Sequence, residues 1–179
     1  MSSPLGLSRV QMSRMLMAHP IFSGLEEDEL DELVESSEIL RLVTGECLFA
    51  EGDPGSDLYV VLGGRFRISC TSPDGVEVVV GMVEDNGLIG EMSAFDPAPR
   101  SATASAAVES TVVRVPNTQF LEMVRQGRPA ARGLLRWIRS HVCHRLRVLD
   151  ERIDAVFLPA AEPPRADGLW RASVGEEQR

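Results

Sequence analysis

Residues 87–103, GLIGEMSAFDPAPRSAT, carry the strongest indication of both fold and function. Gly90 allows a ligand to approach the backbone closely, because glycine has no Cβ. Residues 91–95 are long enough for one helical turn, whose free amide groups would point at an anion. Arg100 offers a planar guanidinium that matches two phosphate oxygens and keeps its charge at every physiological pH. Together these residue types predict a site for an anion.

Two neighbouring side chains narrow the chemistry of that anion. Ser101 adds a hydroxyl beside Arg100, and Glu91 adds a carboxylate. An ionised carboxylate only accepts hydrogen bonds, so Glu91 suits a ribose hydroxyl better than a phosphate. An anion site next to such an acceptor predicts a nucleotide whose phosphate lies close to its ribose. The same residues also allow a structural interpretation, in which Arg100 simply pairs with Glu91 at the surface.

Around this stretch, short β-forming runs alternate with turn residues, which is typical of an antiparallel barrel or roll. We expect strands at residues 40–43, 48–50, 58–62, 65–71, 76–83, 102–108 and 111–115. In the fourth run, Phe66, Ile68 and Cys70 share one face and polar residues share the other. Cys70 is therefore expected to face the core as a small hydrophobe and not to be a reactive thiol.

Helical patterns flank the predicted strands. We expect helices at residues 8–18, 26–36, 118–126 and 130–156. Asn117 is a favourable N-cap for the third of these helices. The last helix carries one apolar stripe at spacings of three and four, made of Leu135, Ile138, Val142, Leu146, Leu149, Ile153 and Val156. Such a stripe is unfavourable in water, so it predicts a homodimer through this helix.

The fold class that follows is α+β. We expect an antiparallel β-roll of the jelly-roll type (a double-stranded β-helix), flanked by N-terminal helices and a long C-terminal helix. The chain divides into an N-terminal extension at 1–14, a domain at 15–157 and a tail at 158–179. The tail is polar and contains prolines, so we expect it to be disordered.

The composition excludes several classes of function. The formal net charge of -9 argues against a general affinity for the nucleic-acid backbone. The chain has no lysine, which excludes Schiff-base chemistry and a phosphate-loop lysine. The cysteines are widely spaced and odd in number, so no disulfide framework is expected. With no long apolar run and no secretion signal, the sequence predicts a cytoplasmic protein without a membrane span.

Seven short motifs stand out along the chain: 19–25 (HPIFSGL), 44–46 (TGE), 48–49 (LF), 51–53 (EGD), 58–64 (LYVVLGG), 89–92 (IGEM) and 100–102 (RSA). In this order they resemble the cyclic-nucleotide-binding domain family, in particular the sensor half of bacterial cyclic AMP receptor proteins. The last two motifs are similar to the family's phosphate-binding cassette. The similarity extends over about residues 15–157.

The resemblance implies a role for each residue of the cassette. Arg100 would bind the cyclic phosphate, and Glu91 would bind the ribose 2'-hydroxyl. Backbone amides of the Gly90-Glu91 turn and the Ser101 hydroxyl would complete the anion site. The full set of implied ligand-binding residues is Gly90, Glu91, Met92, Ser93, Arg100, Ser101 and Ala102.

In the resembling family, the long C-terminal helix also forms a lid over the base. The corresponding positions are Leu149 and Asp150, which lack the hydroxyl groups that often contact adenine. The resemblance favours cAMP as the ligand. A hydroxyl at Ser101 is also where a cGMP-selective sensor would contact guanine, so cGMP stays an alternative.

Three other interpretations compete with a nucleotide sensor. A cupin-like metal enzyme would need histidines inside the roll, but His19, His141 and His144 lie outside the predicted strands. A transcription factor would need a helix-turn-helix, and the 20 residues after Pro159 are too few and too rich in proline. A degenerate scaffold, which keeps the fold and binds no nucleotide, is the third.

The sequence therefore predicts a regulatory sensor in which a cyclic nucleotide shifts a population of conformations. We expect no catalytic residues, no metal and no cofactor. The partners would be the nucleotide, a second copy of the chain and an unidentified effector protein. Neither DNA nor a membrane is expected to be a partner.

Overall fold

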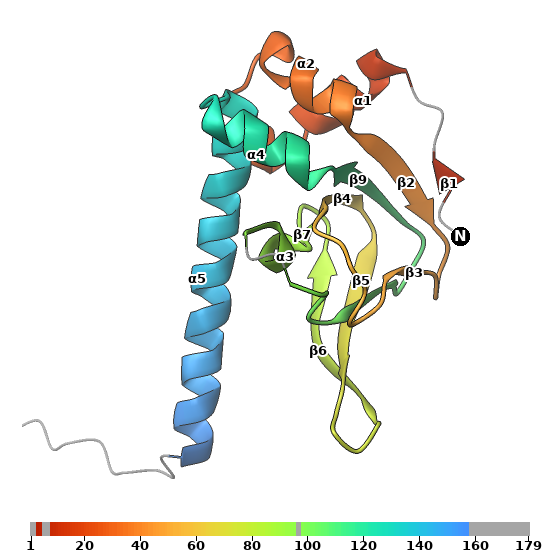
Figure 1. Ribbon diagram of the computed structural model, residues 1–179, viewed down its shortest axis with the longest axis vertical. Coiled ribbons are helices and arrows are strands. Elements are labelled where there is room, and N and C mark those ends of the chain that lie inside the picture. The colour runs from red at the N-terminus through yellow and green to blue at the C-terminus, as the bar shows by residue number, and fades with distance from the viewer. Residues whose placement is uncertain (1–2, 5–7, 96–97, 158–179) are drawn as a thin grey trace, which may run out of the picture. The chain divides into compact units, whose positions relative to one another are not determined.

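The computed structural model describes residues 3–4, 8–95 and 98–157 of the 179-residue chain (Figure 1). The chain divides into two compact units, one up to His141 and one from Val142 onward. The first unit holds the β-roll, the helices that cover it and every predicted residue of the cassette. The second unit begins within the last helix, whose side chains are described as far as residue 147, except residue 145.

Two antiparallel sheets make up the roll. One sheet runs in the order β1-β2-β9-β4-β7, and the other in the order β3-β8-β5-β6. The strands are β1 (Ser3–Pro4), β2 (Glu38–Leu42), β3 (Cys47–Phe49), β4 (Leu58–Gly63), β5 (Arg65–Thr71), β6 (Glu77–Glu84), β7 (Leu88–Ile89), β8 (Thr103–Ala106) and β9 (Ser110–Val115). All pairings between them are antiparallel, so the predicted roll is confirmed.

The helices lie outside the sheets. They are α1 (Arg9–Met17), η1 (Pro20–Phe22), α2 (Glu27–Ser36), α3 (Glu91–Phe95), α4 (Asn117–Arg125) and α5 (Pro129–Phe157). Helices α1, α2 and α4 gather at one end of the roll, where α2 contacts both of the others (Figure 1). Among the described residues, no helix combines the length and apolarity that crossing a bilayer requires.

Aliphatic side chains fill two apolar clusters, because the chain has few aromatic residues. One cluster lies inside the roll around Phe66, and the other lies under the helices around Phe22 and Phe120. All three rings are almost completely buried, with 0–1% of their surface exposed. The cluster under the helices packs α1, α2 and α4 against the sheet that contains β4 and β9, and the cluster inside the roll packs the two sheets against each other.

The alternating pattern predicted for β5 fails at its end. The pairing with β6 shifts register after Ile68, so that Val80 is an extra residue opposite β5. Ser69 is buried and donates a hydrogen bond to Glu77 (2.7 Å), while Cys70 is only half-buried. The prediction of a core-facing Cys70 was wrong, because a β-bulge increases the local twist and redirects side chains.

The start of α4 also differs from the prediction. Asn117 is the first residue of the helix, Pro116 occupies the N-cap position, and no side chain at that position caps the helix. The cap comes from Asp57, whose Oδ1 accepts a hydrogen bond from the Asn117 backbone N–H (3.2 Å). The acceptor that an N-terminus needs is thus supplied by a residue distant in the sequence.

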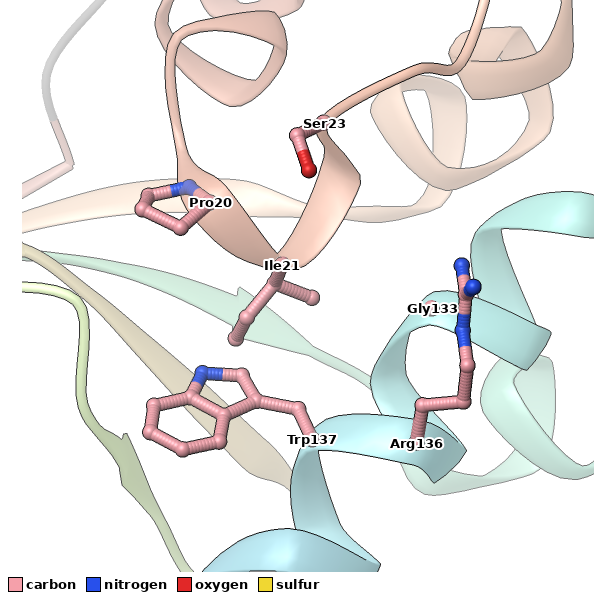
Figure 2. Close-up of a pocket in the computed structure, with 6 residues that line it drawn as sticks. All are labelled: Pro20, Ile21, Ser23, Gly133, Arg136 and Trp137. Carbon is pink, nitrogen blue, oxygen red and sulfur yellow. The ribbon is translucent and has the colours of Figure 1, made fainter.

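The first half of α5 packs closely against η1, as Figure 2 shows. A Cβ at Gly133 would lie 2.7 Å from the Ile21 carbonyl oxygen, so only glycine fits at this crossing. Beside the contact lies an open hollow of about 410 Å³ lined by Pro20, Ile21, Ser23, Gly133, Arg136 and Trp137. The Trp137 ring lies below Ile21 in Figure 2, and its Nε1–H donates to the Asn86 carbonyl (3.0 Å).

His19 joins η1 to the roll. Its ring is buried (3% exposed), its Nδ1 accepts from the Ile21 N–H (3.3 Å), and its Nε2 lies 3.3 Å from the Val61 carbonyl. A neutral ring with its proton on Nε2 satisfies both contacts. Burial lowers the pKa of His19 below its ordinary value of 6.5, and the hydrogen bond to Val61 partly opposes that effect.

Acidification should therefore destabilise the fold through His19. Because the folded pKa is lowered, the stabilisation is complete above about pH 6.5 and is lost as the pH falls toward the lower folded value. Between pH 7.5 and pH 5.5 the wild-type Tm should fall more than that of His19→Gln. Thermal unfolding followed by circular dichroism measures both Tm values. His141 and His144 are present in both proteins, so their titration contributes equally to the two pH profiles. Parallel pH profiles for the two proteins would contradict the assignment.

Candidate functional site

The loop between β7 and β8 builds the candidate site. β7 ends at Ile89, and Gly90 takes a φ of +85°, which turns the chain into the short helix α3. A Cβ at Gly90 would lie 2.7 Å from Arg100 Nη1 and 2.7 Å from the Asp57 carbonyl oxygen. The glycine is required twice, for its conformation and for the closeness of the arginine.

Arg100 lies at the centre of this site and is 4% exposed. Its Nη2 donates to the Asp57 carbonyl (2.9 Å), and its Nη1 makes a longer bond to the Gly90 carbonyl (3.4 Å). The guanidinium carbon lies 4.3 Å from the ring centre of Phe49 and 5.7 Å from that of Tyr59. The guanidinium is thus oriented by two carbonyls and two aromatic rings.

All of these partners are neutral. In the part of the chain that the structure describes, no carboxylate lies within ion-pair distance of the Arg100 guanidinium. A guanidinium has five N–H groups, and the two hydrogen bonds to protein acceptors use only part of them. A buried cation without a counter-charge is unfavourable. The arrangement therefore suits an external anion.

The backbone of Arg100 is fixed from both sides by the loop after β3. The Arg100 N–H donates to the Asp53 carbonyl (2.9 Å), and the Gly52 N–H donates to the Arg100 carbonyl (2.8 Å). A Cβ at Gly55 would make ordinary van der Waals contact with Arg100, 3.5 Å from its Nε and Nη2. This loop holds the arginine in place without any ligand.

The other predicted residues divide between buried and exposed positions. Glu91 begins α3 and is buried (7% exposed), and Ser93 is buried too (4%). Met92 is 55% exposed, and its sulfur lies 3.6 Å from the Ser101 hydroxyl. The loop therefore brings Gly90, Arg100 and the start of α3 together, with Ser101 on the exposed side. The structural interpretation placed Arg100 and Glu91 at the surface, whereas both are buried.

Ala102 is half-buried between Ser101 and β8. The Cys70 thiol lies beside this segment and donates to the Ser101 carbonyl (3.4 Å). The predicted lid residues, Leu149 and Asp150, have side chains outside the described residues.

Four residues around Arg100 were not predicted from the sequence to belong to the site: Phe49, Gly55, Asp57 and Tyr59. They lie on β3, on β4 and in the loop between them, and only the closed roll brings them to Arg100. Burial raises the pKa of the Tyr59 hydroxyl, although the charge of Arg100 acts in the opposite direction. The one useful indication in the sequence was the glycine-rich turn at 52–55, which favours a close backbone approach.

Within the described residues, no three histidine, cysteine or carboxylate side chains gather closely enough to hold a metal ion.

A family model for the cyclic nucleotide-binding domain matches residues 39–127, which include the whole loop from Gly90 to Ala102. The crystal structure of the N-terminal domain of a transcriptional regulator from Streptomyces coelicolor is 36% identical, with a TM-score of 0.57. That similarity covers 78% of this chain and 94% of the Streptomyces chain. This chain belongs to the cyclic nucleotide-binding domain family.

Among curated relatives of this cyclic nucleotide-binding domain are two bacterial regulators. A CRP-like cAMP-activated global transcriptional regulator of Mycobacterium tuberculosis is 32% identical over 102 residues, which is 57% of this chain and 46% of that protein. A cyclic AMP receptor protein of Thermus thermophilus is 29% identical over 142 residues, covering 79% and 64% of the two chains. The chain thus spans about half to two thirds of the length of these relatives.

The close fit around Gly90 makes a test of the site possible. Gly90→Ala should lower the Tm more than Gly75→Ala, because both glycines have a positive φ (+85° and +79°) but only Gly90 faces atoms within 4 Å. The shared backbone strain costs about 1–3 kcal/mol in either variant, so the difference reports the crowding of Arg100 and of the Asp57 carbonyl. Differential scanning fluorimetry measures both shifts. Equal losses in the two variants would show that the packing of Arg100 and the Asp57 carbonyl does not need this glycine.

Proposed function

We propose that this chain is a regulatory sensor that binds a cyclic nucleotide, with cAMP favoured, and transmits binding to a partner by a change of conformation. One observation carries the proposal: a buried Arg100 guanidinium whose protein partners, among the described residues, are all neutral. A cyclic phosphate carries one negative charge and two exocyclic oxygens, which matches the planar fork of an arginine.

In this proposal the cassette residues divide the ligand between them. Arg100 binds the cyclic phosphate, assisted by the amides of the Gly90-Glu91 turn and by the Ser101 hydroxyl. Glu91 accepts the hydrogen bond of the ribose 2'-hydroxyl. Ser93 supports the turn from its buried side, and Met92 and Ala102 border the ligand.

The names of the two bacterial relatives support cAMP, since one is described as cAMP-activated and the other as a cyclic AMP receptor. The exposed hydroxyl of Ser101 favours cGMP as the second candidate, because it offers a donor and an acceptor to the base. Leu149 and Asp150 are the candidate lid positions, and neither carries the hydroxyl group that often contacts adenine in the family. We propose no chemistry on the nucleotide.

We also propose that α5 joins two copies of the chain. Val142 and Leu146 of the apolar stripe are 38% and 55% exposed. The working unit would be the domain at residues 15–157, with 1–14 as an extension and 158–179 as a tail. The effector would be another protein that recognises the bound state.

Calorimetric titration with cAMP and cGMP tests the sensor directly. Arg100→Ala should weaken binding by about 3–5 kcal/mol, because the phosphate would lose a buried charged partner. Arg41→Ala, which removes an exposed arginine paired with Glu109, is the matched control and should bind like wild type. If Arg100→Ala weakens nucleotide affinity less than tenfold, the proposed role of Arg100 in phosphate binding is wrong. A folded wild type that binds neither nucleotide would instead be the degenerate scaffold.

The same titration assigns Glu91. Wild type should prefer cAMP over 2'-deoxy-cAMP, and Glu91→Gln should narrow that preference because a neutral amide is a weaker acceptor for the hydroxyl. If both proteins discriminate equally, the ribose contact lies elsewhere.

The dimer has its own test. Leu146→Glu places a charge on the apolar stripe and should shift the protein to monomers, as measured by size-exclusion chromatography with light scattering. Arg147→Glu puts the same charge on the neighbouring exposed position and should leave the mass unchanged. If both variants remain dimers, the interface lies outside α5.

A further inference from the structure

Asp57 lies directly before β4 and connects three elements through its carboxylate. Its Oδ2 accepts from Arg114 Nε on β9 (2.7 Å), and its Oδ1 accepts from the Asn117 N–H at the start of α4 (3.2 Å). Arg114 also donates to Glu38 on β2 (2.7 Å). The Asp57 side chain is one quarter exposed, so these bonds are partly shielded from water.

The main chain of the same residue holds the arginine of the candidate site. The Asp57 carbonyl accepts the shorter of the two hydrogen bonds of the Arg100 guanidinium, at 2.9 Å against 3.4 Å for Gly90. One residue therefore contacts the anion-binding group through its carbonyl and the first turn of α4 through its carboxylate. The next residue, Leu58, pairs with Val115 in the sheet. Because this pairing anchors the main chain beside Asp57, the carbonyl contact to Arg100 and the carboxylate contact to α4 cannot easily move independently.

We propose that Asp57 is a positioning residue that couples occupancy of the anion site at Arg100 to the start of α4 and, through it, to α5. The inference rests on the proposed function for the identity of the ligand. An anion on the remaining N–H groups of Arg100 attracts the guanidinium away from its position against the Asp57 carbonyl. The hydrogen bond to Asp57 then changes, and the carboxylate that caps α4 moves with it.

The path from α4 to α5 is short. Helix α4 ends at Arg125 and α5 begins at Pro129, so only residues 126–128 separate them. The Arg128 N–H donates back to the Met123 carbonyl (2.9 Å), and its side chain pairs with Glu32 of α2 (2.8 Å). A displacement at the first turn of α4 reaches α5 without crossing a flexible linker.

Glu38 provides a matched comparison for Asp57. Both carboxylates bind Arg114, and together they raise the pKa of Arg114 above its ordinary value, Asp57 through the larger effect. Only Asp57 also contacts Asn117 and Arg100. A variant at Glu38 therefore removes a carboxylate from the same arginine and leaves the proposed coupling intact.

The test follows the Asn117 backbone amide by NMR hydrogen exchange in the full chain. Without nucleotide, Asp57→Ala should speed its exchange by about tenfold, the effect of losing one helix cap. Asp57→Asn keeps an oxygen acceptor and should restore much of the protection. Arg100→Gln should also alter the exchange rate of this amide, and Glu38→Gln should not.

The second part of the experiment repeats the hydrogen-exchange measurement with saturating cAMP, or with cGMP if cGMP binds better. In wild type and Glu38→Gln the nucleotide should change exchange at Asn117 and in the first turns of α5 by about fivefold or more. Asp57→Ala should still bind, because its carbonyl and Arg100 remain, but should lose that response. A full response in Asp57→Ala overturns the inference, as does an unchanged Asn117 amide in Arg100→Gln. If wild type binds neither nucleotide, the proposed function fails, and the nucleotide-free Arg100→Gln comparison still decides the coupling.

Discussion

The structure depends on one buried positive charge. Arg100 is kept inside the roll by two carbonyl oxygens and the faces of two aromatic rings. Such partners orient a guanidinium, but they do not neutralise it, so the charge remains available to a ligand. A carboxylate in the same place would make a self-contained ion pair and close the site to anions. In the proposed function, these neutral partners are what makes an anion site out of a packed loop.

That constraint explains several features that are unrelated in the sequence. Gly90 lies where any side chain would clash with the guanidinium, because a Cβ there would lie 2.7 Å from Arg100 Nη1. The loop at 50–55 hydrogen-bonds to the backbone N–H and C=O of Arg100, so both main-chain groups are already satisfied without a ligand. Asp57 uses its carbonyl for Arg100 and its carboxylate for Arg114 and α4, so the network that orients the arginine is also part of the framework. The site and the fold share their hydrogen bonds.

The parts that the sequence predicted are those set by local patterns. The strands and helices follow from periodicity, and the cassette at 87–103 carries its glycine, acid and arginine within one short segment. The parts that it missed depend on long-range contacts. Asp57 is 43 positions from Arg100 and 60 from Asn117, so no window of sequence contains the cap of α4 or the acceptor of the guanidinium. Cys70 was misplaced because a bulge depends on the register of the partner strand, which a single strand's alternation does not contain.

The negative charge of the whole chain does not conflict with an anion site. The net charge is -9, and many acidic side chains lie on the exposed face of α2. Charges in solvent are screened over about 8 Å at physiological ionic strength, so remote carboxylates contribute little at Arg100. A charge in direct contact, about 4 Å away and shielded by the roll, interacts by about 4 kcal/mol at an effective dielectric constant near 20. Local burial therefore outweighs global charge. In the proposed function we expect the same balance to give selectivity, because an extended polyanion such as DNA would meet the acidic exterior, while a small cyclic phosphate would need to reach only one guanidinium.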